Sequence, residues 1–299
     1  MKMESVSYIG ETFSLLTALV WGVAVILFKK SGEKVHPVAL NTFKNTLALV
    51  LVLPTMYLFG QSLFHQAPPG EYLLLMLSGA IGIGIADTLF FKSLNQIGAG
   101  LTAIVVCLYS PFIIGLSMIW LGERLTILQL AGALMVVLAV LSTTRKGAFG
   151  AITRRDILQG ILWGVLATAC MAVGIVMIKP ILTRSPLFWA TEVRLIGAVP
   201  ALGLVILFHP LKRRVVSSIN SPGSWGYLVS GSLVGAYVAM VLWLAGMKYT
   251  QASIPSALNQ TSAIFVVLLA AIFLGEPLTF RRVGAVSLAV MGAILVGFG

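Results

Sequence analysis

The chain has 299 residues, of which 59% are hydrophobic and only 10% are charged, with a mean hydropathy of +1.01 and a formal net charge of +11. Soluble domains are typically about 45–50% apolar and about 25% charged, so a water-soluble domain with a single core is excluded. We therefore predict an all-α integral membrane protein.

Ten apolar stretches are each long enough, at roughly 20 residues, to cross a bilayer core as a helix. Helices are expected because backbone groups in lipid must satisfy their own hydrogen bonds, and the stretches lack the alternation of barrel strands. The first stretch has no cleavage-site pattern of small residues, so we expect it to be retained. The predicted spans are 9–28, 38–59, 71–93, 99–121, 127–144, 157–179, 187–208, 225–247, 252–274 and 279–298.

The chain repeats itself at an offset of 153 residues. IWLGERLT at 119–126 falls on IFLGEPLT at 272–279 with six identities in eight. A second offset of 149 residues aligns the earlier spans, for example Lys30 with Lys179. The difference of four residues corresponds to one insertion or deletion between the second and third spans of each half.

The two units, 1–146 and 150–299, each contain five predicted spans. Because five is odd, the second unit enters the membrane from the opposite side. Inverted repeats of this kind are typical of secondary transporters, whose substrate site lies near the bilayer midplane between the repeats. A duplicated channel or scaffold is the alternative interpretation. The predicted fold is thus ten transmembrane helices in two inverted five-helix repeats.

Both hexapeptides, LGERLT and LGEPLT, follow one span and open the next, Ala99 and Ala252 begin the preceding spans, and Pro111 lies upstream of the first copy. In these features the chain resembles the drug/metabolite transporter superfamily, and within it the EamA-type ten-helix members, over nearly its whole length. The resemblance implies a polytopic carrier of small metabolites, often an exporter. One position departs from it, because Ile264 stands where a proline is expected in the second copy.

The repeated hexapeptide also has a structural explanation. Glycine lets the chain turn at a helix end, and Thr126 and Thr279 are candidate N-caps of the fifth and tenth helices. Glu123 and Glu276 are expected at the water interface, where each carboxylate can satisfy free amides of the next helix. A gating or coupling role for the two glutamates is the alternative.

Ionisable side chains inside spans are costly and are therefore candidates for function. Asp87 lies about six residues from the end of the third span and Lys44 about six residues from the start of the second. Both are therefore roughly 9 Å below the same membrane face. Asn41 and Asn45 flank Lys44 one helical step away. Asp87 and Lys44 form either a neutral structural pair or part of a site for substrate binding or proton coupling.

The second half contains its own polar cluster. Glu192 and Arg194 lie about six to eight residues into the seventh span, and Asn259 and Gln260 about seven to eight residues into the ninth. Residues two apart on a helix face different directions, so one of Glu192 and Arg194 can reach the membrane surface instead of a cavity. We favour Asn259 over Gln260 as a cavity residue. The clusters of the two halves suit two gates around one central site.

Tryptophan and tyrosine in spans usually belong to interfacial belts; the spans contain Trp21, Tyr109, Trp163, Tyr237 and Trp243. Tyr237 does not suit a belt, because it lies midway along the eighth span, where its hydroxyl needs a partner. We therefore treat Tyr237 as a candidate cavity residue.

Helix bends are expected at prolines in spans, and the glycine-rich run GAIGIGIAD at 79–87 permits close helix approach. Pro111, Pro180 and Pro255 are the expected kink sites, with Pro180 alternatively ending the sixth helix.

No cofactor and no metal site are predicted. The sequence contains no Walker motif, no HExxH motif and no nucleophile–base pair, so the protein is not expected to be an enzyme or to be driven directly by ATP. Cys107 and Cys170 fall inside apolar spans, and the three histidines show no ligand spacing. The basic residues lie mainly in loops, where they set topology, so no nucleic-acid partner is expected.

An even number of spans puts both termini on one side of the membrane. Of the 20 Lys and Arg residues, 14 lie on the other side or at its span ends, so the positive-inside rule predicts that the termini are outside. We expect a multi-pass protein of the cell membrane, which is the inner membrane if the source is a bacterium. Because one chain contains both halves, a functional monomer is expected.

The predicted function is secondary transport, in the outward direction, of small polar or amphipathic metabolites such as amino acids, by alternating access to a site between the repeats. A passive channel or facilitator for small solutes is the main alternative. The candidate residues for substrate binding or coupling are Asp87, Lys44, Asn41, Asn45, Glu192, Arg194, Asn259 and Tyr237.

Overall fold

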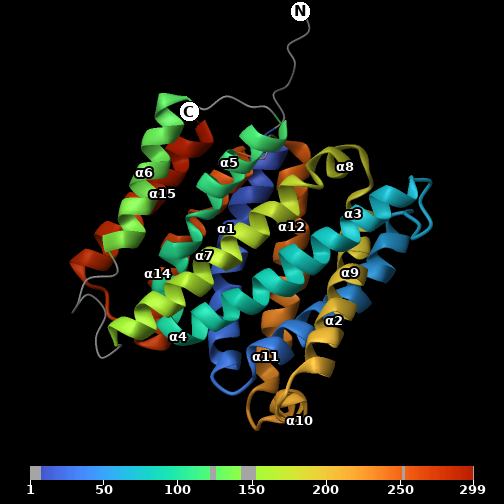
Figure 1. The fold of residues 1–299 in the computed structure, drawn as a ribbon, viewed down its shortest axis with the longest axis horizontal. Helices are drawn as coiled ribbons and strands as arrows, with labels where there is room; N and C mark the ends of the chain where they lie inside the picture. Colours follow the sequence, from blue (N-terminus) through green and yellow to red (C-terminus); the bar gives the residue numbers. More distant parts are fainter. Residues whose placement is uncertain (1–7, 122–125, 143–152, 251–252, 299) are drawn as a thin grey trace, which may run out of the picture.

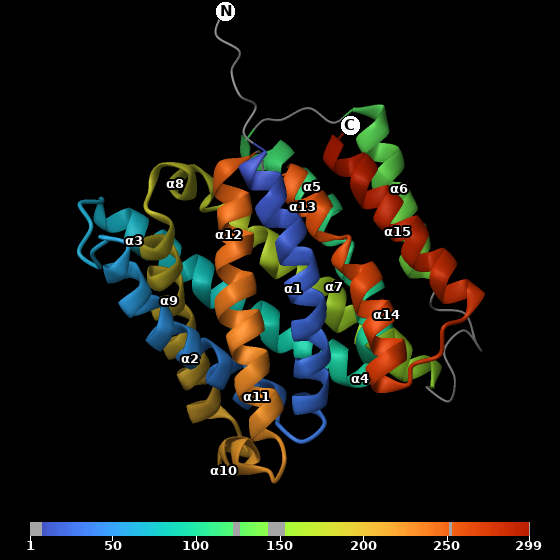
Figure 2. The same cartoon turned by 180° about the vertical axis from the view of Figure 1, so that it is seen from behind.

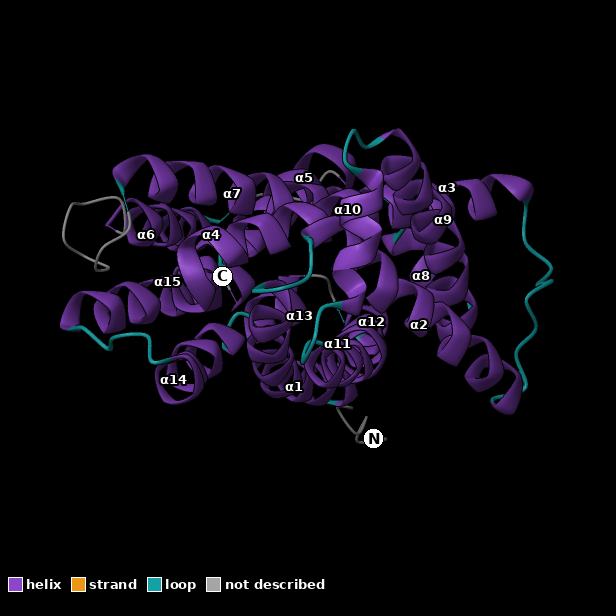
Figure 3. Cartoon of the chain, turned by 90° about the horizontal axis from the view of Figure 1, so that it is seen from below, coloured by secondary structure: helices purple, strands orange, loops and turns teal. Residues whose placement is uncertain are grey.

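The computed structural model of the protein describes residues 8–121, 126–142, 153–250 and 253–298, and every regular element in them is helical (Figure 3). Eight helical stretches are long and apolar enough to cross a membrane, and two shorter apolar helices accompany them. In chain order the elements are α1 (Ile9–Gly32), α2 (Pro37–Leu58), α3 (Pro69–Gly79), the π-helix η1 (Ala80–Ile85), α4 (Ala86–Val106), α5 (Tyr109–Leu121), α6 (Ile127–Ser142), α7 (Arg154–Val176), α8 (Lys179–Arg184), α9 (Leu187–Phe208), α10 (Lys212–Ser217), the 3₁₀ turn η2 (Ser218–Asn220), α11 (Trp225–Gly231), the π-helix η3 (Ser232–Ala239), α12 (Met240–Tyr249), α13 (Ser253–Asn259), α14 (Ser262–Leu274) and α15 (Phe280–Phe298).

The helices lie side by side in one bundle. α6 and α15 pair at one side, α2, α3 and α9 lie at the other, and α1, α4, α7 and α12 run between them (Figures 1 and 2). α1 begins and α15 ends at the same end of the bundle (Figures 1 and 2). This agrees with the expectation that the two ends of the chain share one side.

The predicted third and fourth spans are divided differently from the expectation. One helical stretch runs from Pro69 to Val106 and is interrupted only at Gly98, whose φ of +81° is left-handed. A second break follows at Cys107 and Leu108, before α5. Pro111 accounts for this break, because proline has no amide hydrogen to donate to the carbonyl four residues earlier.

The ninth predicted span is also broken, between α13 and α14, although the aligned proline is missing. The chain bends at Gln260 and Thr261, where the amide of Gln260 bonds the nearer carbonyl of Ala257 at 3.0 Å. Pro255 lies in the first turn of α13, five residues before this bend, and does not cause it. The carbonyl four residues before Pro255 lies outside the described residues, so Pro255 as a kink site stays a prediction. Pro180 is the second residue of α8, which follows the end of α7 at Val176. This matches the alternative interpretation, in which Pro180 ends the sixth helix.

The glycine-rich run lets α3 and η1 approach α9 and α7 closely. A Cβ atom on Gly79 would overlap the backbone carbonyl of Arg194, and one on Gly82 would lie 3.2 Å from Cα of Gly174. Close backbone approach of this kind is what small residues provide in membrane bundles. Asp87 at the start of α4 and Arg194 in the middle of α9 both line one cavity.

The junctions after the repeated hexapeptides contain the expected caps. Thr126 Oγ1 accepts a 3.1 Å hydrogen bond from the amide of Gln129, and Thr279 Oγ1 accepts one of 3.3 Å from Arg282. The prediction for Glu276 is wrong in its amide partners. Its carboxylate accepts hydrogen bonds from the amides of Ala99 and Gly100, in the last quarter of the Pro69–Val106 stretch, and not from amides of α15. Glu123 lies outside the described residues.

Candidate functional site

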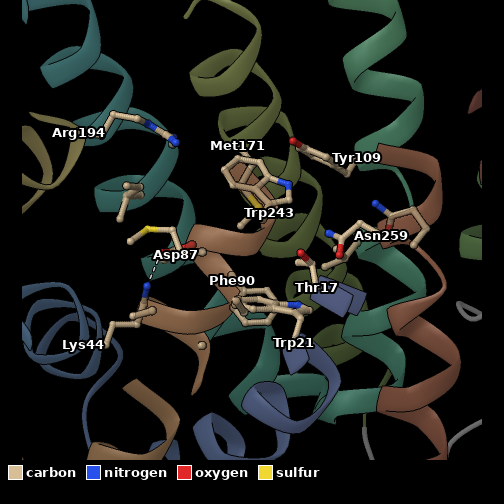
Figure 4. A pocket seen from close by; sticks show the side chains of 18 residues that line it. Thr17, Trp21, Lys44, Asp87, Phe90, Tyr109, Met171, Arg194, Trp243 and Asn259 are labelled. Carbon is tan, nitrogen blue, oxygen red and sulfur yellow. Dashed lines mark hydrogen bonds and ion pairs between the residues drawn. The ribbon is translucent and has the colours of Figure 1, made fainter. Parts of the chain in front are cut away.

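A cavity of about 100 Å³ lies inside the bundle, among helices from both halves of the chain (Figure 4). This volume has room for several water molecules or one small solute. Its walls are mainly apolar, and they contain three charged side chains. The lining residues are Thr17, Trp21, Lys44, Gly82, Ile83, Asp87, Phe90, Val106, Tyr109, Met171, Arg194, Gly235, Ala236, Ala239, Met240, Trp243, Asn259 and Gln260.

Asp87 and Lys44 meet in one wall of the cavity. Lys44 Nζ lies 2.6 Å from Asp87 Oδ2, and the two side chains are only 5% and 8% exposed. Phe91 lies under the ammonium group, with its ring centroid 5.7 Å from Nζ. A buried ion pair gains attraction in a low dielectric but loses hydration, so it stabilises a fold little or not at all. The Lys44–Asp87 pair is therefore a candidate for a function in the cavity.

Asn41 and Asn45 support this pair from behind and do not line the cavity. Asn41 Nδ2 donates to the carbonyls of Ile83 and Gly84, at 3.1 and 2.9 Å, which belong to the π-helix η1. Asn45 Nδ2 donates to Asn41 Oδ1 at 2.7 Å, and Asn45 Oδ1 lies 3.4 Å from Lys44 Nζ. The amides thus fix η1, and with it the start of α4 that carries Asp87.

Arg194 enters the cavity from α9, on the wall above the ion pair in Figure 4. Its Nε donates a 3.0 Å hydrogen bond to Ser78 Oγ, which donates in turn to the carbonyl of Gly174 at 2.6 Å. The guanidinium carbon lies 5.7 Å from the ring centroid of Trp243. Arg194 is 1% exposed, and its Nη1 has no hydrogen-bond partner among the described residues.

Glu192 faces away from the cavity. Phe188, one helical turn earlier on the same face of α9, stacks on Phe59 beyond the end of α2, with ring centroids 4.8 Å apart. Glu192 is not among the residues that line the cavity, and its Oε2 is buried without a hydrogen-bond partner among the described residues. Glu192 and Arg194 are both almost fully buried, so the expectation that one of them reaches the membrane surface is wrong.

Asn259 and Gln260 both line the cavity, which corrects the expectation that only one of them faces it. That expectation assumed a continuous helix, on which neighbours point about 100° apart. The helix ends at Asn259, and the chain bends before α14, so the usual angle does not apply. Asn259 Oδ1 is buried without a hydrogen-bond partner among the described residues.

Tyr237 does not line the cavity. Its hydroxyl lies 2.6 Å from Thr55 Oγ1, and this contact joins η3 to α2. Three aromatic residues that sequence reasoning assigned to interfacial belts line the cavity instead: Trp21, Tyr109 and Trp243. For Trp21 the signal is its position midway along a span, and for Tyr109 it is the helix break just before it.

The arrangement offers a small solute two kinds of surface. Trp21, Phe90 and Met171 form apolar walls, whereas Arg194 and Asn259 present polar atoms (Figure 4). Breaks in α-helices at membrane depth are tolerated where the chain lines a cavity, and the breaks after Val106 and after Asn259 lie next to cavity residues. Such a cavity can bind a polar solute inside an apolar bundle.

Comparison with known proteins assigns the chain to a family. The EamA-like transporter family model matches residues 8–145 and again residues 158–298. Two proteins of Archaeoglobus fulgidus, each described as an uncharacterized transporter, are 23% identical to the chain; the alignments cover 94% and 95% of this chain and 96% of each relative. A solved crystal structure at 21% identity superposes with a TM-score of 0.67, covering 96% of this chain and 94% of that one, and supports the fold alone.

The family match spans nearly the whole chain in two copies, and the apolar helices cross a membrane several times. The protein is therefore a multi-pass protein of the cell membrane that belongs to the EamA-like transporter family.

Proposed function

We propose that the protein is a secondary transporter that moves small polar or amphipathic metabolites, amino acids among them, through the cavity by alternating access. The observation that carries the proposal is an apolar membrane bundle enclosing a cavity with Lys44, Asp87 and Arg194 in its walls. Buried ionisable groups in a membrane protein usually mark a substrate or ion pathway.

The inverted-repeat architecture is part of the proposal, with ten spans divided between residues 1–146 and 150–299. Three observations support it. The family model matches the chain twice; the helix breaks at Cys107–Leu108 and Gln260–Thr261 are related by the same 153-residue offset as the hexapeptides; and π-helices occur in the third and eighth predicted spans. Broken helices beside a midplane site are characteristic of inverted-repeat transporters.

Both halves of the chain contribute to the walls of the cavity, for example Lys44 from the first and Arg194 from the second. One chain therefore supplies a complete site, which supports a functional monomer. Outward transport and termini on the outside are the remaining parts of the proposal; they rest on the family resemblance and on the distribution of basic residues.

The proposal is tested by counterflow in proteoliposomes that contain the full-length protein. Vesicles preloaded with one of a panel of amino acids and small metabolites should take up the same labelled compound against its gradient, with saturation at high concentration. Saturable counterflow supports a carrier. Flux that never saturates and shows no exchange indicates a channel instead, and overturns the alternating-access proposal.

Two variants test the roles of the carboxylates of Asp87 and Glu192 in the same assay. Asp87→Asn is expected to abolish or strongly reduce counterflow, because it leaves the ammonium group of Lys44 unpaired in the cavity wall. Glu192→Gln reports proton coupling: loss of pH dependence with exchange retained would identify Glu192 as the coupling group. Glu33→Gln, an exposed position at the end of α1, is the matched control and should transport as the wild type does.

A further inference from the structure

We propose that the cavity is a binding site for solutes with one net negative charge, whose oxyanion is held by Arg194 and whose apolar part lies against Trp243 and its neighbours. The inference rests on the proposed transport function and names its substrate class. It goes beyond the metabolite panel above by giving an order of preference among solutes of the same size and different charge.

The first argument is the charge of the cavity walls. Three lining side chains carry charge, namely Lys44, Asp87 and Arg194. The ammonium group of Lys44 and the carboxylate of Asp87 already neutralise each other at 2.6 Å. The guanidinium group remains as one net positive charge, and no carboxylate of the described residues lies within ion-pair distance of it. A buried charge without a counter-ion is expensive, and a monoanionic solute supplies the counter-ion.

The second argument is how the guanidinium group is held. Ser78 Oγ accepts a hydrogen bond from Nε of Arg194 at 3.0 Å. The Ser78 hydroxyl is fixed in turn, because it donates to the carbonyl of Gly174. The side chain is thereby anchored at Nε, while Nη1 remains without a partner among the described residues. A fork of parallel N–H donors matches an oxyanion in two-point geometry. An arginine that served only to tie helices together would use its terminal nitrogens in protein contacts.

The third argument is the space beside the guanidinium group. Gly82 faces it, and a Cβ atom at this position would lie 3.5 Å from Nη2. The glycine therefore leaves this side of Nη2 free of a side chain. The ring centroid of Trp243 lies 5.7 Å from the guanidinium carbon. Figure 4 shows the guanidinium end and the Lys44–Asp87 pair on separate parts of the wall, so an anion can reach Arg194 without breaking the pair.

The remaining walls do not favour a cation. Asn259 provides a buried carbonyl oxygen without a partner, which accepts a hydrogen bond from a hydroxyl or amine of the solute. Thr17 and Gln260 are further neutral polar groups in the lining. Asp87, the acidic side chain of the lining, is already bonded to Lys44. We therefore expect affinity to fall from a monoanion to a zwitterion, then to a neutral solute, and then to a cation.

The test uses small probes with nearly the same carbon body and different charge, measured on the full-length protein in lipid nanodiscs by isothermal titration and by ligand-induced shifts of the unfolding temperature. Butanoate and 1-propanesulfonate are monoanions, 2-aminobutanoate is a zwitterion, 1-butanol is neutral and butylamine is a cation. Propyl phosphate, which approaches two negative charges above its second pKa of about 6, distinguishes a phosphate ester from a monoanionic carboxylate or sulfonate.

We expect both monoanions to bind about tenfold or more tightly than butylamine, because a hydrogen bond to a charged group contributes more than a neutral one. Propyl phosphate should bind more weakly than butanoate, since it overcompensates the single positive charge. Arg194→Gln should remove the preference for anions. Arg184→Gln is the matched control: Arg184 is 62% exposed, pairs with Glu71 and lies outside the cavity lining, so the preference should be unchanged.

A second variant tests the inference in case the Arg194→Gln protein does not fold. Asn259→Asp introduces a carboxylate into the lining and leaves Arg194 in place, so the cavity becomes neutral and the preference should move toward neutral and cationic probes. Equal affinity for butanoate and butylamine in the wild type would overturn the inference. So would an anion preference that survives in folded Arg194→Gln protein.

The inference and the proposed function fail in different ways. Anion binding that depends on Arg194, in a protein that shows no saturable counterflow for any compound, supports the binding site and removes the transporter. Saturable counterflow that is limited to cations or neutral solutes and is insensitive to Arg194→Gln keeps the transporter and overturns the anion site.

Discussion

The carboxylate of Glu276 caps a helix segment that begins 177 residues earlier in the chain: its Oε1 accepts a 2.7 Å hydrogen bond from the amide of Ala99. Oε2 accepts another, of 3.2 Å, from the amide of Gly100. These amides lack partners within their own helix because Gly98 breaks α4 immediately before them. A carboxylate at the start of a helix satisfies such donors and interacts favourably with the helix dipole. The LGEPLT loop is thereby joined to the first half of the protein.

Replacing Glu276 by alanine should lower the free energy of unfolding by about 1–2 kcal/mol through the lost cap. The loss of the carboxylate partner of Arg282 should add to this decrease. The measurement is the unfolding temperature in nanodiscs. Glu33→Ala, at an exposed glutamate, is the control. Equal unfolding temperatures for the two variants would contradict the capping role.

Breaking the pair between Lys44 and Asp87 should be more harmful than removing it. Asp87→Leu or Lys44→Met alone leaves one buried charge unpaired, and we expect each to cost about 3–5 kcal/mol of stability. The double variant should recover most of that loss. Thermal unfolding measures stability, and counterflow measures function. A stable double variant that still transports normally would show that the pair is structural; a stable variant without transport would show that it serves the cavity.

The glycine-rich run should tolerate alanine at one position and not at another. A Cβ atom at Gly79 would overlap the backbone carbonyl of Arg194, which cannot move away as a flexible side chain can. Gly79→Ala should therefore cost at least about 1–3 kcal/mol, the usual range for overpacking, or prevent folding. Gly84→Ala is the control from the same run, because its Cβ would meet its nearest neighbours at 3.8 Å, an ordinary contact. Fluorescence-detected gel filtration and thermal unfolding compare the two variants; similar profiles would refute the packing argument.

The stability of the protein should depend on the protonation of His36. Nδ1 of its neutral ring accepts a 3.3 Å hydrogen bond from the amide of Val38 at the start of α2. Burial, followed by the nearby His209 and Lys92, lowers the pKa of His36 below its ordinary value of 6.5. The unfolded chain therefore binds the proton more readily than the folded one. The stabilising contribution is complete above about pH 6.5 and is lost as the pH falls from there through the lower folded pKa.

Unfolding temperatures between pH 8 and pH 5 check this expectation. His36→Asn keeps a side-chain acceptor at the N-cap but does not titrate, so its unfolding temperature should decline less on acidification than that of the wild type. His65→Asn, which leaves His36 intact, should retain the wild-type decline. A decline of the same size in His36→Asn would assign the acid sensitivity to other groups.

Several features of the fold follow directly from the sequence. Long apolar stretches predicted the membrane helices, because a helix is the simplest structure that satisfies backbone hydrogen bonds in lipid. α9, at Leu187–Phe208, has the predicted bounds. The caps at Thr126 and Thr279 were also predictable, since a cap depends only on residues within one turn. Lys44 and Asp87 stood out by the cost of burying a charge, and the prediction that they lie at the same depth is consistent with their 2.6 Å contact.

The tertiary structure decided which polar side chains share the cavity. Sequence spacing shows that Glu192 and Arg194 face different directions, but the direction of each is set by how α9 packs against α2 and η1. Asn259 and Gln260 both reach the cavity because the helix ends between α13 and α14, in a segment that lacks the expected proline. Glu276 accepts from the backbone amide of Ala99, and not from amides of its own next helix, because Gly98 frees the amides of Ala99 and Gly100. Hydropathy and local propensity determine the helices, whereas long-range packing fixes their rotation, their breaks and their partners.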